Sequence, residues 1–152
     1  MPDQTDERAD ARQDCPLCAE FESTPHVLAR TPHAVAFIPP WSRGVPSVAV
    51  VPRVHAQSFE KMGFDEFEST FEAAVEIMPS LRKAFDPEGM NFWWDEGAAA
   101  GQVLPHTFIE LACRFQDSDY RYRPLDELPL RPDGEREAIH KRVLDEMGRD
   151  GV

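Results

Sequence analysis

Residues 91–114 read NFWWDEGAAAGQVLPHTFIELACR, and this stretch decides the fold of the chain. It opens with an aromatic run typical of a β-strand, followed by a turn of small residues between Gly97 and Gly101. After Pro105 the side chains alternate, and in a strand such alternation sends them to opposite faces. One face carries His106, Phe108, Glu110 and Ala112, and the other carries Thr107, Ile109, Leu111 and Cys113. We expect the second face to join the core and the first to line the site.

Length and charge restrict the class of protein. The chain has 152 residues, of which 41% are hydrophobic, and a formal net charge of −12. This length suits one domain that buries its own core. The negative charge disfavours nucleic acid and anionic membranes as partners. No apolar run is long enough to span a bilayer and the acidic N-terminus is unlike a signal peptide, so we expect a cytoplasmic protein.

The pattern along the chain predicts an α+β fold: a five-stranded, mainly antiparallel sheet packed on one long helix. Strands are expected at residues 27–30, 33–38 and 47–51, and the opening stretch supplies the fourth and fifth. The long helix is expected from about Phe64 to Ala84, because apolar residues recur there every three or four positions. Its expected core stripe consists of Phe64, Phe67, Phe71, Val75, Met78, Leu81 and Phe85.

Composition changes at both ends of this pattern. We expect residues 1–14 to be a disordered acidic N-terminus, residues 15–115 to form the domain, and residues 116–152 to form a C-terminal extension. The proline-rich part of the extension (117–134) is expected to be extended along the surface. After Asp133-Gly134 a short helix is expected to run to about Met147, with an apolar side that packs on the core or on a partner subunit.

The opening stretch resembles the signature of the histidine triad (HIT) superfamily. That signature has an Asn/Asp-x-Gly turn, a Gly-Gln pair, and a strand with three histidines at alternate positions. Asp95-Glu96-Gly97, Gly101-Gln102 and His106 match it, whereas Phe108 and Glu110 replace the second and third histidines. The resemblance covers roughly Cys15 to Arg114. It implies a homodimer whose sheets join across a two-fold axis.

A second motif, CPLC, places Cys15 and Cys18 where two thiolates can bind one metal. Zinc-containing members of the superfamily add a histidine after the third strand and the first triad histidine, so the resemblance implies a Zn²⁺ site made by Cys15, Cys18, His55 and His106. Four protein ligands leave no open position for water, and the metal would be structural. The alternative is a metal-free descendant in which the two cysteines are a reducible pair or inert. Cys113, on the expected core face, is predicted to be a buried free thiol.

Replacement of the middle histidine bears on catalysis. In the family this histidine attacks the α-phosphate of a nucleotide, which requires a ring nitrogen with a free lone pair. Phe108 has no such atom, and the nitrogen of a zinc-bound His106 is occupied. The resemblance also places Pro39 where the family has an acid for the ribose, and Ser47 where it has a further histidine. The standard HIT hydrolase mechanism is therefore not expected.

The charges of the site also differ from the family pattern. Asp95 and Glu110 would repel a phosphate by about 1–4 kcal/mol per close pair. Three arginines can offset this repulsion, although each is more commonly a solvated surface charge: Arg43, Arg53 and Arg114. Burial of Glu110 against Phe108 would raise the pKa of its carboxyl group.

We expect a small-molecule pocket lined by Phe37, Pro39, Ser47, Asp95, Gln102, Phe108 and Glu110. Aromatic walls with acidic groups suit a neutral or cationic, partly aromatic molecule. The preferred interpretation is a zinc-containing HIT-like protein with a degenerate active site that binds such a ligand. One alternative is a repurposed enzyme that uses Glu110 or Asp95 on a non-nucleotide substrate. The other is a nucleotide hydrolase or transferase with an altered mechanism.

Overall fold

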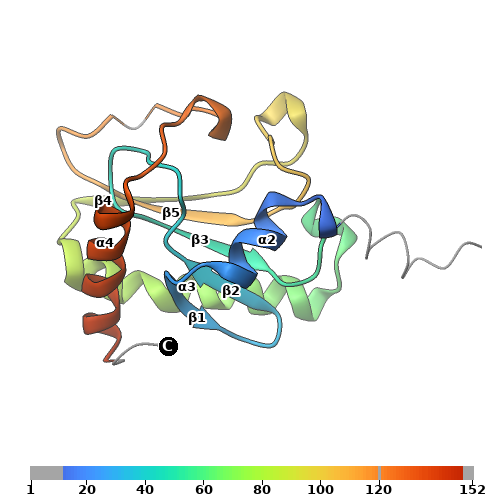
Figure 1. Ribbon diagram of the computed structural model, residues 1–152, viewed down its shortest axis with the longest axis horizontal. Coiled ribbons are helices and arrows are strands. Elements are labelled where there is room, and N and C mark those ends of the chain that lie inside the picture. Colours follow the sequence, from blue (N-terminus) through green and yellow to red (C-terminus); the bar gives the residue numbers. More distant parts are fainter. Residues whose placement is uncertain (1–11, 120, 149–152) are drawn as a thin grey trace, which may run out of the picture.

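A five-stranded antiparallel sheet lies at the centre of the protein, in the strand order β1-β2-β3-β5-β4 (Figure 1). The computed structural model describes residues 12–119 and 121–148, so most of the expected disordered N-terminus lies outside the described residues. The strands are β1 (Val27–Arg30), β2 (Ala34–Phe37), β3 (Ser47–Pro52), β4 (Gly89–Trp93) and β5 (Ile109–Arg114). The five expected strands are confirmed, although β5 begins at Ile109, after His106 and Phe108.

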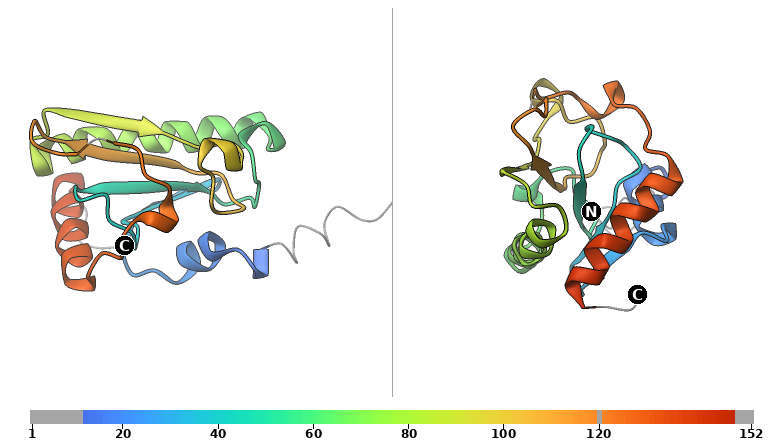
Figure 2. Two further views of the ribbon diagram at one scale, coloured as in Figure 1. Left: turned by 90° about the horizontal axis from the view of Figure 1, so that it is seen from above. Right: turned by 90° about the vertical axis from the view of Figure 1, so that its left-hand side faces the viewer.

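Within residues 12–119 and 121–148, three α-helices surround the sheet: α2 (Pro16–Ser23), α3 (Phe64–Phe85) and α4 (Asp133–Met147). Short 3-10 turns are η1 (Phe59–Lys61), η2 (Ala98–Ala100) and η3 (Leu125–Glu127). Figure 2 shows α3 along one face of the sheet, α2 on the other side, and α4 across one end. The long helix and the C-terminal helix are confirmed. No helix of the described segments is both long and apolar enough to cross a membrane.

Helix α2 was not expected from the sequence, where its first residues were interpreted only as a cysteine knuckle. Cys15 is its N-cap, and the Cys15 Sγ accepts a hydrogen bond from the backbone N–H of Cys18 at 3.5 Å. Pro16 follows, and a proline at the first helical position lacks only an N–H that has no partner there. The helix therefore holds both cysteines close to the sheet.

The main core lies between the sheet and α3. The residues that α3 buries there differ in part from the apolar stripe expected from the sequence. The buried residues of α3 are Thr70, Ala73, Ala74, Ile77, Leu81 and Ala84. By contrast, Phe64, Phe71 and Val75 are 73%, 38% and 48% exposed. Small residues bring the helix close to the sheet, and the larger aromatic side chains lie along its flank next to β4. The Phe71 and Phe92 rings, for example, have centroids 5.0 Å apart.

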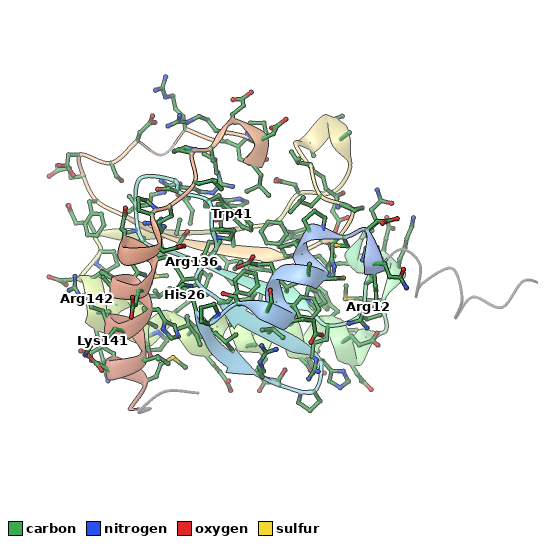
Figure 3. The ribbon with its side chains drawn as sticks, in the orientation of Figure 1. Arg12, His26, Trp41, Arg136, Lys141 and Arg142 are labelled. Atoms are coloured by element: carbon green, nitrogen blue, oxygen red, sulfur yellow. The ribbon has the colours of Figure 1, made fainter. Side chains whose placement is uncertain are left out.

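Helix α4 packs on this same core through Ile139, Val143 and Leu144. Of the two expected positions for its apolar side, the core and a partner subunit, the structure shows the core. Arg136, on the neighbouring face of α4, is buried and donates through Nε to the Ile38 carbonyl at 2.7 Å. Figure 3 shows Arg136 close to His26, at the junction between α4 and β1. The extension is therefore an integral part of the domain.

The opposite face of the sheet carries a second cluster. Its buried members include both cysteines of the CPLC motif, Phe37 and Trp41. Leu104, Phe108, Leu125 and Leu128 are partly buried against it. This face also holds Phe108, which contacts the Trp41 ring.

Candidate functional site

Two cysteines and two histidines meet beside α2. The Cys18 Sγ lies 3.4 Å from the Nδ1 atom of His55 and 3.3 Å from that of His106. The Cys15 Sγ lies 3.6 Å from His106 Nδ1, and all four ligand atoms are within 4.8 Å of one another. Tetrahedral zinc with ordinary Zn–S and Zn–N bonds separates its ligand atoms by about 3.3–3.8 Å. Cys15, Cys18, His55 and His106 therefore form a cluster that can hold a metal ion.

The environment of His106 suits a metal ligand. Its side chain is fully buried, and its Nε2 atom lies 2.8 Å from the Pro52 carbonyl oxygen. That oxygen can only accept, so Nε2 carries the proton and donates, and the lone pair of Nδ1 faces the sulfur atoms. Such a hydrogen bond from the second ring nitrogen is the usual way in which a ligating histidine is oriented.

The thiols of Cys15 and Cys18 differ in acidity. Hydrogen bonding between the thiols lowers the pKa of Cys15 and raises that of Cys18. One thiolate and one thiol are therefore favoured by the pair alone. A divalent cation held by Cys15 and Cys18 would take the place of the remaining proton and stabilise both thiolates.

The floor of the pocket is a buried ion pair. Glu110 is 1% exposed, and its carboxylate accepts from the Arg43 Nε–H and from the Trp41 indole N–H, the latter at 2.7 Å. Burial raises the pKa of Glu110, while Arg43 and the Trp41 N–H lower it. Because each carboxylate oxygen already faces a donor, the geometry favours the ionised form.

This arrangement corrects one expectation about charge. Arg43 was interpreted as more commonly a solvated surface charge, but its side chain is only 5% exposed and is paired with Glu110. Arg53 is exposed, and Arg114 is partly buried and donates to the Asn91 side-chain oxygen at 2.7 Å. One of the two carboxylates expected to repel a phosphate is therefore neutralised by the protein itself.

Four of the expected pocket residues line one cavity: Asp95, Gln102, Phe108 and Glu110. The Phe108 ring packs against the Trp41 ring, with centroids 5.5 Å apart. The amide of Gln102 bonds to Gly97 N–H and to the Gln57 and Leu104 carbonyl oxygens, so it shapes the surrounding turn.

The other three expected pocket residues do not line this cavity. Phe37 belongs to the second core cluster and is fully buried. Pro39 and Ser47 are also buried, and the Ser47 hydroxyl has no hydrogen-bond partner. These residues lie beneath or beside the pocket, because Trp41 and Arg43 occupy the space above the sheet.

One side of the cavity is bordered by the part of the C-terminal extension that precedes α4, residues 121–130, here called the covering segment. The Tyr122 hydroxyl donates to the Asp95 carboxylate at 2.6 Å, and the Arg43 guanidinium donates to the Arg123 carbonyl oxygen at 3.0 Å. Leu125 forms part of the cavity wall. The space that the cavity leaves for a small molecule is about 10 Å³, which is room for about one water molecule.

Trp41 links the covering segment to the sheet. It forms an isolated β-bridge with Leu130, while its indole N–H donates to Glu110. In Figure 3, Trp41 lies beneath the ribbon of the covering segment. The sequence did not predict these roles, because Trp41, Arg43 and Tyr122 stand in turn-rich or proline-rich stretches without periodicity. A tryptophan and an arginine within one turn were the available signal.

Comparison with known proteins shows which family and which relatives this chain resembles in sequence. Residues 20–111 match the family described as the HIT domain. An uncharacterised HIT-like protein of Mycoplasma genitalium is 27% identical over 93 residues, which cover 61% of this chain and 66% of that protein, just under two thirds of its length. An uncharacterised HIT-like protein of Mycoplasma pneumoniae is 23% identical, with 70% of this chain and 75% of that protein covered.

Solved structures share the fold. A Zn-bound histidine triad family protein from Mycobacterium smegmatis has a TM-score of 0.71 and 17% identity, covering 90% of this chain and 95% of that one. A hypothetical histidine triad nucleotide-binding protein from Sulfolobus tokodaii has a TM-score of 0.75 and 14% identity, covering 88% and 92%. A Hit-like protein from Bartonella henselae has a TM-score of 0.73 and 16% identity, covering 88% and 97%.

Proposed function

The chain belongs to the HIT domain family, and from this premise we propose that it is a zinc-containing member that lacks nucleotidyl transfer and binds a small neutral or cationic molecule. The observation that carries the proposal is the replacement of the nucleophile. At the middle triad position stands Phe108, whose ring packs against Trp41 and offers no lone pair.

Zinc is the metal that this donor set fits best. Two thiolates and two imidazoles at tetrahedral separations suit Zn²⁺ better than Mg²⁺ or Ca²⁺, which take oxygen ligands. All four ligands come from the protein, so the ion would supply no bound water for catalysis. Its role would be to hold α2 against the residues that follow β3 and precede β5.

His106 is not available as a substitute nucleophile. Its Nε2 proton is held by the Pro52 carbonyl oxygen and its Nδ1 faces two sulfur atoms. A ring nitrogen that attacks phosphorus needs a free lone pair aimed at the substrate. Neither nitrogen of His106 meets that requirement.

The surroundings of Glu110 also oppose a new acid–base site. A general acid or base must exchange a proton with substrate at hydrogen-bond distance. Both oxygens of Glu110 face protein donors, and the side chain is buried. Asp95 is closer to the surface, but its carboxylate accepts from Tyr122. These contacts favour a binding role over an enzyme that uses Glu110 or Asp95.

A ligand-binding role is supported by the chemistry of the cavity walls. Trp93 and Phe108 supply aromatic surface, and the Arg43 guanidinium lies 4.8 Å from the Trp93 ring centre. Asp95 adds a hydrogen-bond acceptor near the surface. Such walls suit a small, partly aromatic molecule without a phosphate.

We further propose a homodimer and a cytoplasmic location. The flank of α3 leaves Phe64, Phe71 and Val75 exposed beside β4, which is an edge strand of the sheet. A contiguous exposed apolar surface of this kind commonly marks a protein interface. The three cysteines are free thiols, which fits a reducing compartment. The net charge of −12 argues against nucleic acid as a partner.

Incubation with adenosine phosphoramidate tests the central claim. We expect no turnover above the uncatalysed rate and no covalent nucleotidyl adduct after acid quench. An intact HIT hydrolase assayed in parallel is the positive control. Turnover within tenfold of that control, lost on Glu110→Gln, would replace the binding proposal with an enzyme.

A further inference from the structure

The covering segment contacts three residues that line the pocket, Arg43, Asp95 and Gly101, through groups that a ligand could also use. Its Tyr122 hydroxyl donates to Asp95 at 2.6 Å and also lies 3.3 Å from the Gly101 carbonyl oxygen. The Tyr122 ring lies 5.9 Å from the guanidinium carbon of Arg43, at cation–π distance. These contacts resemble recognition of a small aromatic molecule by a polar and aromatic site.

The backbone of the same segment satisfies a second group of the pocket. The Arg123 carbonyl oxygen accepts from an Arg43 NH1 group at 3.0 Å, while Arg43 Nε is occupied by Glu110. Gly101 has a φ of +94° and no side chain, and a Cβ atom there would collide with the Tyr122 hydroxyl. The turn is therefore shaped to accept a phenol ring at this place.

The segment is held loosely in comparison with the floor beneath it. Tyr122 is 46% exposed and the Arg123 side chain is also exposed, whereas Arg43 and Glu110 are almost fully buried. A segment with few buried apolar contacts opens at a lower free energy than the core. Its anchors at the far end are backbone hydrogen bonds, from Ser42 N–H to the Pro129 carbonyl oxygen and from Arg131 N–H to that of Pro40.

We propose that the covering segment is an intramolecular ligand, and that the free ligand of this pocket is a neutral phenol that carries a carbonyl group. Its hydroxyl donates to Asp95, its carbonyl oxygen accepts from Arg43 NH1, and its ring takes the place of Tyr122. Arg43 holds its position throughout, because Glu110 and Trp93 support it from the other sides. This inference rests on the proposed ligand-binding function and specifies its ligand.

Binding of N-acetyl-L-tyrosinamide, measured by isothermal titration calorimetry, tests the proposal. This probe carries the phenol hydroxyl and the peptide carbonyls of the covering segment without a charge. Wild type is expected to bind it at least about tenfold more weakly than Tyr122→Ala, because the internal competitor lowers the fraction of open pocket. Glu127→Ala, a change at an exposed position of the same segment, is expected to bind like wild type.

The matched probe N-acetyl-L-phenylalaninamide lacks only the hydroxyl. Tyr122→Ala is expected to bind it about 10–100-fold more weakly than the tyrosine probe, the effect of one hydrogen bond to a charged acceptor. Asp95→Asn in the Tyr122→Ala background should reduce that preference to less than about threefold. Leu125→Ala, which loosens the segment at another place, should also bind the tyrosine probe more tightly than wild type.

Two outcomes overturn the proposal in different ways. If Tyr122→Ala binds both amides equally, or binds the tyrosine probe no better than wild type does, the segment is only a structural cover. Tyramine, a cationic phenol, separates this result from failure of the proposed function. Binding of tyramine without binding of the neutral probe leaves a ligand pocket of another class, whereas binding of neither probe by the opened variant rejects the ligand-binding function as well.

Discussion

Glu110 and Arg43 form an ion pair in which both side chains are almost completely buried, at 1% and 5% exposure. Glu110 occupies the position of the third triad histidine, and Arg43 comes from the turn between β2 and β3. The pair occupies space that a phosphate would need. The Trp41 N–H donates a hydrogen bond to the other oxygen of the Glu110 carboxylate. Under the proposed function, Phe108 at the middle triad position is thus accompanied by a pocket floor made by a buried ion pair.

Removal of one partner of this pair is expected to destabilise the fold strongly. Arg43→Met leaves the Glu110 carboxylate buried with only Trp41 as a donor, and breaking a buried pair costs about 3–5 kcal/mol. The free energy of unfolding, from urea titration followed by tryptophan fluorescence, measures the effect. Arg43→Met combined with Glu110→Gln should recover most of the loss, since no unpaired charge remains. If the double variant lost as much free energy of unfolding as Arg43→Met and Glu110→Gln lose together, this account would be contradicted.

The fold could largely be predicted from the sequence because its strongest signals are local. Alternation after Pro105 placed Ile109, Leu111 and Cys113 in the core, where they lie. The recurrence of apolar residues located α3, but it could not distinguish the core face from the flank. Aromatic residues dominate the flank, and the packing distance to the sheet, set by Ala73 and Ala74, is a tertiary property.

The site was only partly predictable, for a related reason. The metal-ligating residues follow a spaced motif, and the structure brings all four together. Trp41 and Arg43 instead act through contacts with Glu110, which stands more than 65 positions away, and Tyr122 bonds to Asp95, 27 positions away. Neither periodicity nor local spacing carries information about such contacts, so the ion pair beneath the pocket and the covering segment beside it could not be predicted.

Loss of one thiolate is expected to release the metal. Cys18→Ser removes the sulfur that lies nearest to both histidines, and a serine hydroxyl is a poor zinc ligand. Elemental analysis of wild type purified without added metal should find about one zinc per chain, and the variant should contain less than about a tenth of that. Stability should fall as well, because metal-binding free energy is also folding free energy. Cys113→Ala, which changes a cysteine outside the cluster, should keep its zinc; zinc-free wild type of unchanged stability would exclude the metal.

A charge on the exposed flank of α3 should weaken the homodimer. Val75→Glu places a carboxylate on an apolar surface where Val75 is 48% exposed, so the monomer should fold while the interface should not form. Sedimentation velocity at micromolar concentration should show a dimer for wild type and a monomer for the variant. Ala138→Glu introduces the same charge on an exposed position of α4 and should remain dimeric. A monomeric wild type would reject the proposed interface.

Alkaline pH should destabilise the protein through Cys113. Burial raises the pKa of this thiol from 9.0 to about 11 in the folded state. Between these values the unfolded chain loses the proton while the folded chain keeps it, so stability falls as the pH rises, by on the order of 2–3 kcal/mol in total. The comparison is the pH dependence of unfolding in wild type and in Cys113→Ala. Loss of the sulfur changes the free energy of unfolding of Cys113→Ala by the same amount at every pH. Between pH 9 and 11 the free energy of unfolding of the variant should therefore fall less steeply than that of wild type. Equal slopes would show that Cys113 does not titrate in this way.

Restoration of the missing histidine alone should not restore nucleotidyl transfer. In Phe108→His the new ring would lie beside Trp41, above a carboxylate in place of the third histidine, and beneath a covering segment that leaves about 10 Å³. A nucleophile needs room for the phosphate and donors for its developing charge, and Glu110, whose carboxylate already accepts from Arg43 and Trp41, offers no donor. Adenosine phosphoramidate assays of Phe108→His are therefore expected to remain at the background of wild type. Phe108→His with Glu110→His and Tyr122→Ala restores two histidines and opens the pocket, and it is the variant in which any activity should first be measurable. Turnover by Phe108→His alone at more than about a hundredth of an intact HIT hydrolase would show that the floor and the covering segment do not block the chemistry.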